Sequence, residues 1–512
     1  MQRYCCISIA ILLISLNKRL KGLEYLKLDT SGPKHPLFGG PQPVKEKLTV
    51  IGFVDDVKGL ITSVKEFDTL DRTLSLFEKA TGSRLHRNAE SRKCNSLTLG
   101  RWSRWSQADS PLNYMSIVSE INMLGVTLGR NSSKSRAANG EELVRRVQKK
   151  LSIYKSGRFS PLTCKPFTAN TYLLSKLTHR CGVISLRAAD TRKIQSLIKT
   201  WITQELLQKP PEMILFRDPA EGGLGLISVE ARSTANLIKN LIDLGHEKSK
   251  HKTLYMSSVY RAFVSDEEDM RALVKRPSFL PQVVYDVIKE ATEDDNDMIV
   301  GYTTKTWQER VTKRFITHNR DPQTGICTLI PTKQEDLNSD SDWDNIWQNM
   351  RCKGLTPSQT SYLFKMVHNL LPHNSKLLQF GLRDNDTCNF CPQSDSRSHL
   401  WRCTQAAGLG SIVKQILEEH VAHNKEVPWD ELCRLEVDLQ QQYTLQAMIL
   451  IAEVGSHISA SRTKEKKCEP ELLTATLRTR AAALQASKKY VQAGRTLNQW
   501  IESYFLYASP PS

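Results

Sequence analysis

The sequence has no apolar run long enough to cross a membrane, since a spanning helix needs about 20 apolar residues. Its longest such run, Cys5–Leu16, has 12 residues and follows a single Arg3. No small-x-small cleavage pattern follows, so we expect a buried helix, with a signal or anchor segment as the minor alternative. These features exclude a polytopic membrane protein and predict an intracellular protein, cytoplasmic or nuclear, with no membrane partner.

Cysteine is scarce, with 12 in 512 residues, which is too few for a disulfide scaffold. Apolar residues make up 40% and charged residues 24%, so a wholly disordered chain and a collagen are also excluded. Three of the cysteines fall within the short segment 388–403. That distribution favours a reducing compartment with one local metal site over a secreted protein.

Several catalytic motifs are missing. The sequence has no G-x-x-x-x-G-K-[ST] phosphate loop, no G-x-S-x-G nucleophile elbow and no H-E-x-x-H metal motif. The sequence therefore favours none of the reactions that these motifs serve.

What the sequence does have is positive charge, and that charge is unevenly placed. The formal net charge is +17, with 40 basic and 22 acidic side chains in residues 1–250, against 31 and 32 in residues 251–512. Residues 101–200 alone carry 18 basic and 5 acidic side chains. A field this concentrated indicates a polyanionic partner, nucleic acid before a membrane surface.

The pattern of residues 141–154 predicts an amphipathic helix with apolar residues at 143, 147, 151 and 154. Its other face carries four basic side chains: Arg145, Arg146, Lys149 and Lys150. We expect these side chains to bind nucleic-acid phosphates without sequence preference and with steep salt dependence. The alternative is a solvated face. Nearby, Trp102 and Trp105 either pack against the strand layer, which we favour, or stack on bases.

A strand is predicted at 48–54 and a second short apolar run lies at 60–64, which together indicate a hairpin around Asp55 and Asp56. Paired carboxylates at a strand end are suited to Mg²⁺, which phosphoryl transfer uses to clamp reacting oxygens.

Further predicted elements are a helix over 67–80 stopped by Gly82, a strand over 121–129, a helix over 191–207 capped by Asp190, a tight turn over 222–226 and one long basic helix over 471–504.

The segment from residue 388 to residue 403 has the spacing C-x₂-C-x₇-H-x₃-C, given by Cys388, Cys391, His399 and Cys403. Three thiols and an imidazole can close a tetrahedral structural Zn²⁺ site, with the first pair on a turn and the second on one helical turn. Buried free cysteines or a disulfide are the alternatives. His368 and His373 are possible alternate ligands, although we favour core or surface roles for them.

Four short motifs resemble non-LTR (LINE-type) retrotransposon reverse transcriptases. Phe53-Val54-Asp55-Asp56 resembles their F/Y-x-D-D box, and 77–85 looks like the helix and glycine that follow it. Met123-Leu124-Gly125-Val126 resembles their primer-grip strand, and 222–226 a turn beyond their thumb. The Cys/His segment, with its lead-in 364–372, is similar to their CCHC segment, although the spacing before Cys403 is often one residue longer there.

The resemblance implies RNA-templated DNA synthesis with Mg²⁺, in which Asp55 is a metal ligand and Asp56 its neighbour. It also implies a third catalytic aspartate and a nucleotide-positioning box upstream, and neither is present before Asp55. Asp29, the one aspartate there, has no matching context. We therefore expect an amino-terminally truncated chain that is inactive alone.

These observations predict an α+β protein that binds RNA and DNA and takes no small-molecule substrate beyond nucleotides. Its expected parts are a partial palm (1–130), a basic helical thumb (131–245), a helical connector (246–350), a CCHC zinc-binding segment (351–410) and a helical tail (411–512). A non-catalytic nucleic-acid-binding zinc protein is the alternative, and a membrane-targeted or secreted protein is a third. The oligomeric state stays open.

Overall fold

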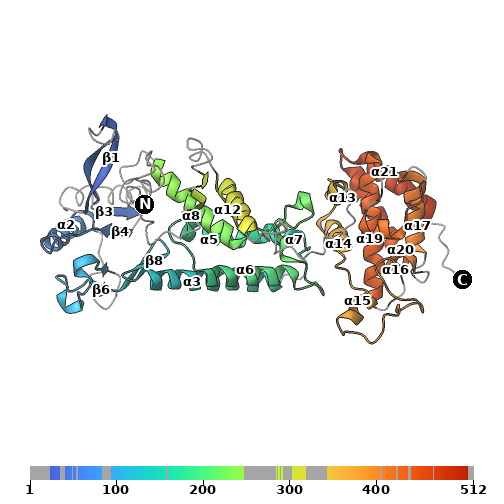
Figure 1. Cartoon of the computed structure of the whole chain (residues 1–512), viewed down its shortest axis with the longest axis horizontal. Coiled ribbons are helices and arrows are strands. Elements are labelled where there is room, and N and C mark those ends of the chain that lie inside the picture. The colour runs from blue at the N-terminus through green and yellow to red at the C-terminus, as the bar shows by residue number, and fades with distance from the viewer. Residues whose placement is uncertain are drawn as a thin grey trace. The chain divides into compact units, whose positions relative to one another are not determined.

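The computed structural model describes residues 23–34, 41–48, 50–53, 56–82, 94–156, 160–246, 284, 286–288, 290–291, 303–318, 343–403, 406, 408–422, 425–435, 437, 440–464, 466 and 468–505. Most of these residues are helical, and the strands form only small sheets, so the chain is α+β with a helical bulk (Figure 1). The apolar run Cys5–Leu16 lies outside the described residues.

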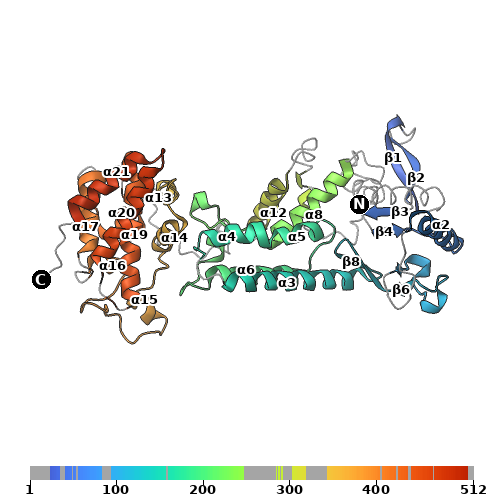
Figure 2. The same ribbon diagram turned by 180° about the vertical axis from the view of Figure 1, so that it is seen from behind.

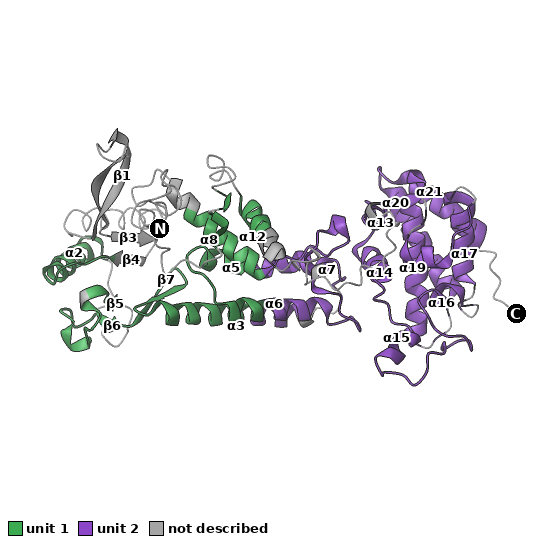
Figure 3. Cartoon of the chain, in the orientation of Figure 1, with its two compact units in different colours: residues 1–147, 175–194, 229–315 green, residues 148–174, 195–228, 316–512 purple. Residues whose placement is uncertain are grey.

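The chain divides into two compact units, each built from three stretches of sequence (Figure 3). Unit 1 comprises 1–147, 175–194 and 229–315, and unit 2 comprises 148–174, 195–228 and 316–512. The five segments predicted from the sequence stay a prediction.

Within the described ranges, the strands form four separate two-stranded sheets. Three pairs are antiparallel and the β5–β6 pair is parallel. In order along the chain, the strands are β1 (Leu23–Lys34), β2 (Pro41–Leu48), β3 (Val50–Phe53), β4 (Asp56–Gly59), β5 (Asn95–Leu97), β6 (Ser116–Val118), β7 (Glu120–Met123) and β8 (Val126–Gly129).

The predicted hairpin around the acidic pair is present, with Phe53 of β3 opposite Asp56 of β4. Its second strand lies at 56–59 and not at 60–64 as predicted. The single strand predicted over 121–129 is also wrong, because β7 and β8 form a hairpin there. Leu124 and Gly125 make its turn with positive φ at both residues, the geometry that a two-residue hairpin requires.

The other regular elements that the structure describes in unit 1 are helices. Its helices are α2 (Lys65–Thr81), η2 (Gly100–Trp102), η3 (Gln107–Asp109), α5 (Ser175–Cys181), α8 (Val229–His246) and most of α12 (Thr304–His318). Helix α2 confirms the predicted helix and ends at Gly82, where φ is +70°. The core between α8 and α12 is closed by buried apolar side chains, among them Ile238, Ile288 and Trp307.

Two long helices, α3 (Ser132–Ser156) and α6 (Ala188–Thr203), run through both units. Both confirm predicted helices, and α3 buries Leu143, Val147 and Leu151 as its period requires. The predicted capping role of Asp190 is wrong. Asp190 lies inside the first turn of α6, where its carboxylate accepts hydrogen bonds from the Arg187 guanidinium at 2.7 and 2.9 Å.

Unit 2 is a helical assembly in which α14, α17 and α20 each pack against the central helix α19 (Figure 2). Its helices are α4 (Cys164–Thr168), η4 (Ala169–Leu173), α7 (Glu212–Phe216), η5 (Pro219–Glu221), α13 (Trp343–Met350), α14 (Pro357–Val367), α15 (Asn374–Gln379), α16 (His399–Arg402), α17 (Leu409–Ile416), η9 (Leu417–Val421), α18 (Trp429–Arg434), η10 (Gln441–Tyr443), α19 (Thr444–Thr463), α20 (Pro470–Ala486), α21 (Val491–Trp500) and η11 (Ile501–Phe505).

The predicted single helix over 471–504 is wrong, because the chain turns between α20 and α21 and the two helices pack together. Gly494 permits this approach, since a Cβ there would lie 2.6 Å from the carbonyl oxygen of Ala481. The predicted tight turn at 222–226 is confirmed, with positive φ at Gly222 and Gly225.

Candidate metal centre

The first two predicted ligands lie on a short turn closed by backbone hydrogen bonds. Thr387 and Ser394 form an isolated antiparallel bridge, and the Cys388 amide donates to the Gln393 carbonyl at 2.8 Å. This closure brings the two ends of the turn together, so that Cys388 and Cys391 project toward the same side, as predicted for the first pair.

The second pair is presented by one helical turn. His399 begins α16, with its amide donating to the Ser396 hydroxyl at 3.2 Å, and the Cys403 amide donates to the His399 carbonyl at 3.0 Å. A spacing of four residues places two side chains on one face of a helix. The predicted placement of this pair on one helical turn is therefore confirmed.

The four ligand atoms converge, all within 4.8 Å of one another. The Cys403 sulfur lies 3.9 Å from that of Cys388 and 4.0 Å from that of Cys391, whose sulfur is 3.2 Å from His399 Nε2. Sulfur ligands about 2.3 Å from a tetrahedral Zn²⁺ lie about 3.8 Å apart, so the spacing fits a bound ion. Cys403 belongs to this cluster as the other two cysteines do.

The cluster is largely shielded from water, with Cys388, His399 and Cys403 buried and Cys391 half-buried. Burial acts to raise the pKa of the Cys388 thiol, but the Phe390 amide and the Arg462 guanidinium outweigh it, and the net shift is downward. Burial lowers the pKa of His399, and the positive charge of Arg462 adds to this effect. A thiolate and a neutral imidazole are the forms that bind metal.

His368 and His373 do not join the cluster. The His368 ring stacks on Trp347, with ring centroids 5.4 Å apart, and its Nε2 donates to the Gly222 carbonyl at 2.8 Å. His373 caps α15 by accepting a hydrogen bond from the Lys376 amide. Both therefore have structural roles, as favoured from the sequence.

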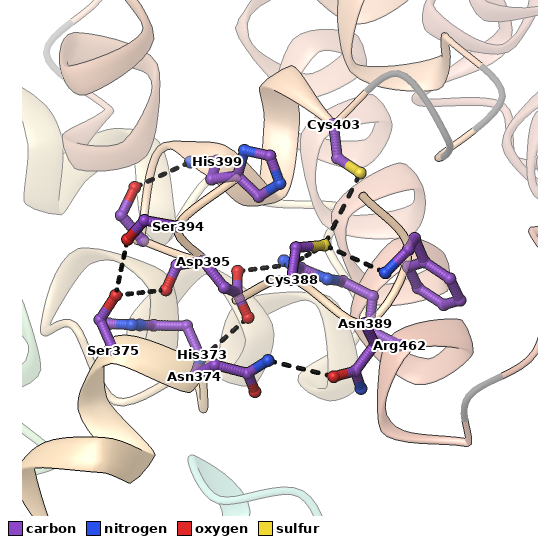
Figure 4. A network of polar contacts seen from close by, with 12 residues as sticks. His373, Asn374, Ser375, Cys388, Asn389, Ser394, Asp395, His399, Cys403 and Arg462 are labelled. Carbon is purple, nitrogen blue, oxygen red and sulfur yellow. Dashed lines mark hydrogen bonds and ion pairs between the residues drawn. The ribbon is translucent and has the colours of Figure 1, made fainter. Parts of the chain in front are cut away.

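Two residues beside the centre were missed by sequence reasoning. Arg462 lies 74 residues after Cys388 and donates to its sulfur at 3.1 Å. The same guanidinium pairs with Asp395, which is buried. No local spacing signals this contact, because Arg462 lies on α19, far along the chain from the cysteine turn. Figure 4 shows Arg462 with Cys388 and Asp395.

The predicted basic face lies on α3. Arg145, Arg146 and Lys149 are exposed, and Lys150 lies 5.6 Å from the centre of the Tyr154 ring. Both arginines bind the Glu142 carboxylate, each with a contact of 2.7 Å. These hydrogen bonds lower the pKa of Glu142 to about 2. The face is therefore exposed as expected, but one carboxylate offsets part of its charge.

The two tryptophans pack against a helix and each other, and their favoured packing against the strand layer stays a prediction. Their ring centroids are 5.1 Å apart, and each lies 6.5 Å from the ring of Phe67 on α2. Both remain half-buried.

Of the predicted catalytic pair, Asp55 lies outside the described residues, and only the backbone of Asp56 is described, at the start of β4. A magnesium site at this hairpin therefore stays a prediction.

Among the described helices, none combines the length and the apolar character that a membrane crossing needs. Compared with protein-family models and with curated proteins, the sequence has no match in either.

Proposed function

We propose that this chain is a zinc-stabilised, reverse-transcriptase-like protein of a LINE-type element that binds nucleic acid and does not synthesise DNA alone. The observation that carries the zinc part is the convergence of four ligand atoms within 4.8 Å, at distances suited to a tetrahedral ion. Three cysteines and one histidine fill all four positions of such an ion. A closed site of this kind is structural, since a catalytic zinc keeps a position open for water or substrate.

Nucleic-acid binding is supported by the excess of positive charge in residues 101–200 and by the exposed cations on α3. Phosphate contacts from such a face position a strand without reading its sequence. The assignment to reverse transcriptases rests on the four short motifs in their family order.

The alternative is a non-catalytic nucleic-acid-binding zinc protein with the same basic face and metal centre. It is favoured by the number of candidate carboxylates, since residues 1–512 hold two of the three that the polymerase resemblance implies. Mg²⁺ would be a cofactor of the reverse-transcriptase-like protein only, and not of this alternative.

The zinc assignment is tested with Cys391→Ala in the full chain. We expect the parent protein to purify with one zinc per chain by elemental mass spectrometry, and the variant to lose it and melt at a lower temperature. Cys352→Ala is the matched control, because Cys352 is also half-buried but lies outside the cluster. Unchanged zinc content and melting in Cys391→Ala would overturn the assignment.

A further inference from the structure

A buried cation touches the metal centre from a distant helix. Arg462 lies in the last turn of α19 with 8% of its surface exposed. Its Nη2 donates to the Cys388 sulfur at 3.1 Å and also to a carboxylate oxygen of Asp395 (Figure 4). One guanidinium thus joins a predicted metal ligand to a second buried charge.

Asp395 in turn joins the cysteine turn to α15. Its other carboxylate oxygen accepts a hydrogen bond from the Asn374 amide at 2.9 Å. Its backbone carbonyl accepts from the amide of Ser375 at 3.1 Å, and its own amide donates to the Asp386 carbonyl at 2.7 Å. Asp395 is therefore held on three sides, so it fixes the place where the Arg462 guanidinium lies.

The charges explain why a cation is needed here. Three thiolates around a divalent ion leave one net negative charge, and Asp395 adds another in the same buried region. Arg462 compensates one of them. Burying a charge without a partner is costly, and the two N–H groups of Arg462 Nη2 serve both acceptors at once.

We propose that Arg462 is a positioning residue of the metal centre, which holds the Cys388 thiolate in place and so couples zinc binding to the docking of α19. The inference rests on the proposed zinc site and adds to it a residue from outside the ligand motif. Partners of metal ligands typically tune affinity by about 10- to 100-fold.

The test compares zinc affinities of full-length variants by competition with a chromophoric chelator, under reducing conditions and at a temperature where all variants are folded. Arg462→Met keeps the length of the side chain and removes its charge and donors, and we expect zinc to bind about 10- to 100-fold more weakly. Arg462→Lys keeps the charge but replaces the planar guanidinium with a compact ammonium, so we expect an intermediate loss of zinc affinity. If Arg462→Met does not fold, the zinc affinity of Arg462→Lys is compared with that of the parent instead.

Arg480→Met is the matched control, because Arg480 of α20 donates to the Gly354 carbonyl, outside the metal centre. We expect this variant to melt at a lower temperature with unchanged zinc affinity. Cobalt substitution adds a spectroscopic readout. Loss of a hydrogen bond to the thiolate raises the energy of the sulfur electrons, so the sulfur-to-cobalt charge-transfer band should move to longer wavelength in Arg462→Met alone.

The outcomes separate this inference from the proposed function. If the parent chain binds no zinc, the proposed site itself fails. If the parent binds zinc but Arg462→Met binds it equally well, or loses no more affinity than Arg480→Met, the positioning role is wrong and the zinc site stands.

Discussion

At the scale of single residues, His368 makes stability depend on pH. Burial, with smaller contributions from the positive charges of Arg217 and Arg397, lowers its pKa to about 4 from an ordinary value of 6.5. As the pH falls from 6.5 toward 4, His368 therefore binds a proton in the unfolded chain but stays neutral in the folded chain. The contribution of His368 to the free energy of unfolding is fully present above pH 6.5 and is lost as the pH falls from 6.5 to 4.

We predict that the parent protein loses about 2 kcal/mol more unfolding free energy between pH 7 and pH 5 than His368→Gln does, since the variant cannot titrate there. Chemical denaturation of both proteins at the two pH values measures the difference. The candidate metal centre is common to both proteins, so any acid release of metal from it cancels in the comparison. Equal pH dependence would contradict a buried neutral histidine.

Gly222 matters because it lies against the Trp347 ring that also stacks on His368. Its φ is +77°, and an added Cβ would be 2.5 Å from the ring. We predict that Gly222→Ala destabilises by about 1–2 kcal/mol through backbone strain and by about 1–3 kcal/mol more through overpacking. Denaturation against Gly381→Ala isolates the second part, since Gly381 has φ +66° and no neighbour within 4 Å. If Gly222→Ala and Gly381→Ala lose the same unfolding free energy, the Trp347 ring moves away from the added methyl group without cost.

At the scale of elements, the exposed face of α3 is the part of the nucleic-acid proposal that can be changed without disturbing a core. We predict that Lys149→Ala/Lys150→Ala weakens binding to single-stranded RNA. The slope of log affinity against log salt should fall by about 1.4, or about 0.7 for each phosphate that is no longer neutralised.

Lys488→Ala/Lys489→Ala is the control for that prediction, because it removes the same charge from a second pair of adjacent lysines, at the turn between α20 and α21. Fluorescence anisotropy across a salt series measures both variants. If the two variants weaken binding alike, only net charge matters and α3 is a solvated face.

The elements also show where sequence patterns are sufficient. Helices α2, α3 and α6 were predicted because an amphipathic period and a stop at glycine are local properties. The hairpin of β7 and β8 was missed because Met123 to Val126 reads as one apolar run, and only positive φ at Leu124 and Gly125 reverses the chain. The break between α20 and α21 was missed for a similar reason, since no proline interrupts that stretch.

At the scale of the whole molecule, we predict that this chain does not catalyse DNA synthesis by itself. We expect residues 1–512 to extend no primer on an RNA template with Mg²⁺, because two carboxylates cannot hold the metals that three would. Binding to the same template should remain and should weaken with salt. A primer-extension assay beside Asp55→Ala/Asp56→Ala measures this. Extension that disappears in the double variant would mean that an unrecognised carboxylate completes the site.

The sequence by itself predicted the clustering of the candidate metal ligands and the amphipathic helices, because both depend on spacings of a few residues that backbone geometry converts directly into proximity. Only the tertiary structure decided the partners of those residues. Arg462 reaches Cys388, and His368 reaches Gly222, across 74 and 146 residues of chain. Contacts at that range depend on how helices pack. The packing results from burial summed over many side chains, and no single spacing records it.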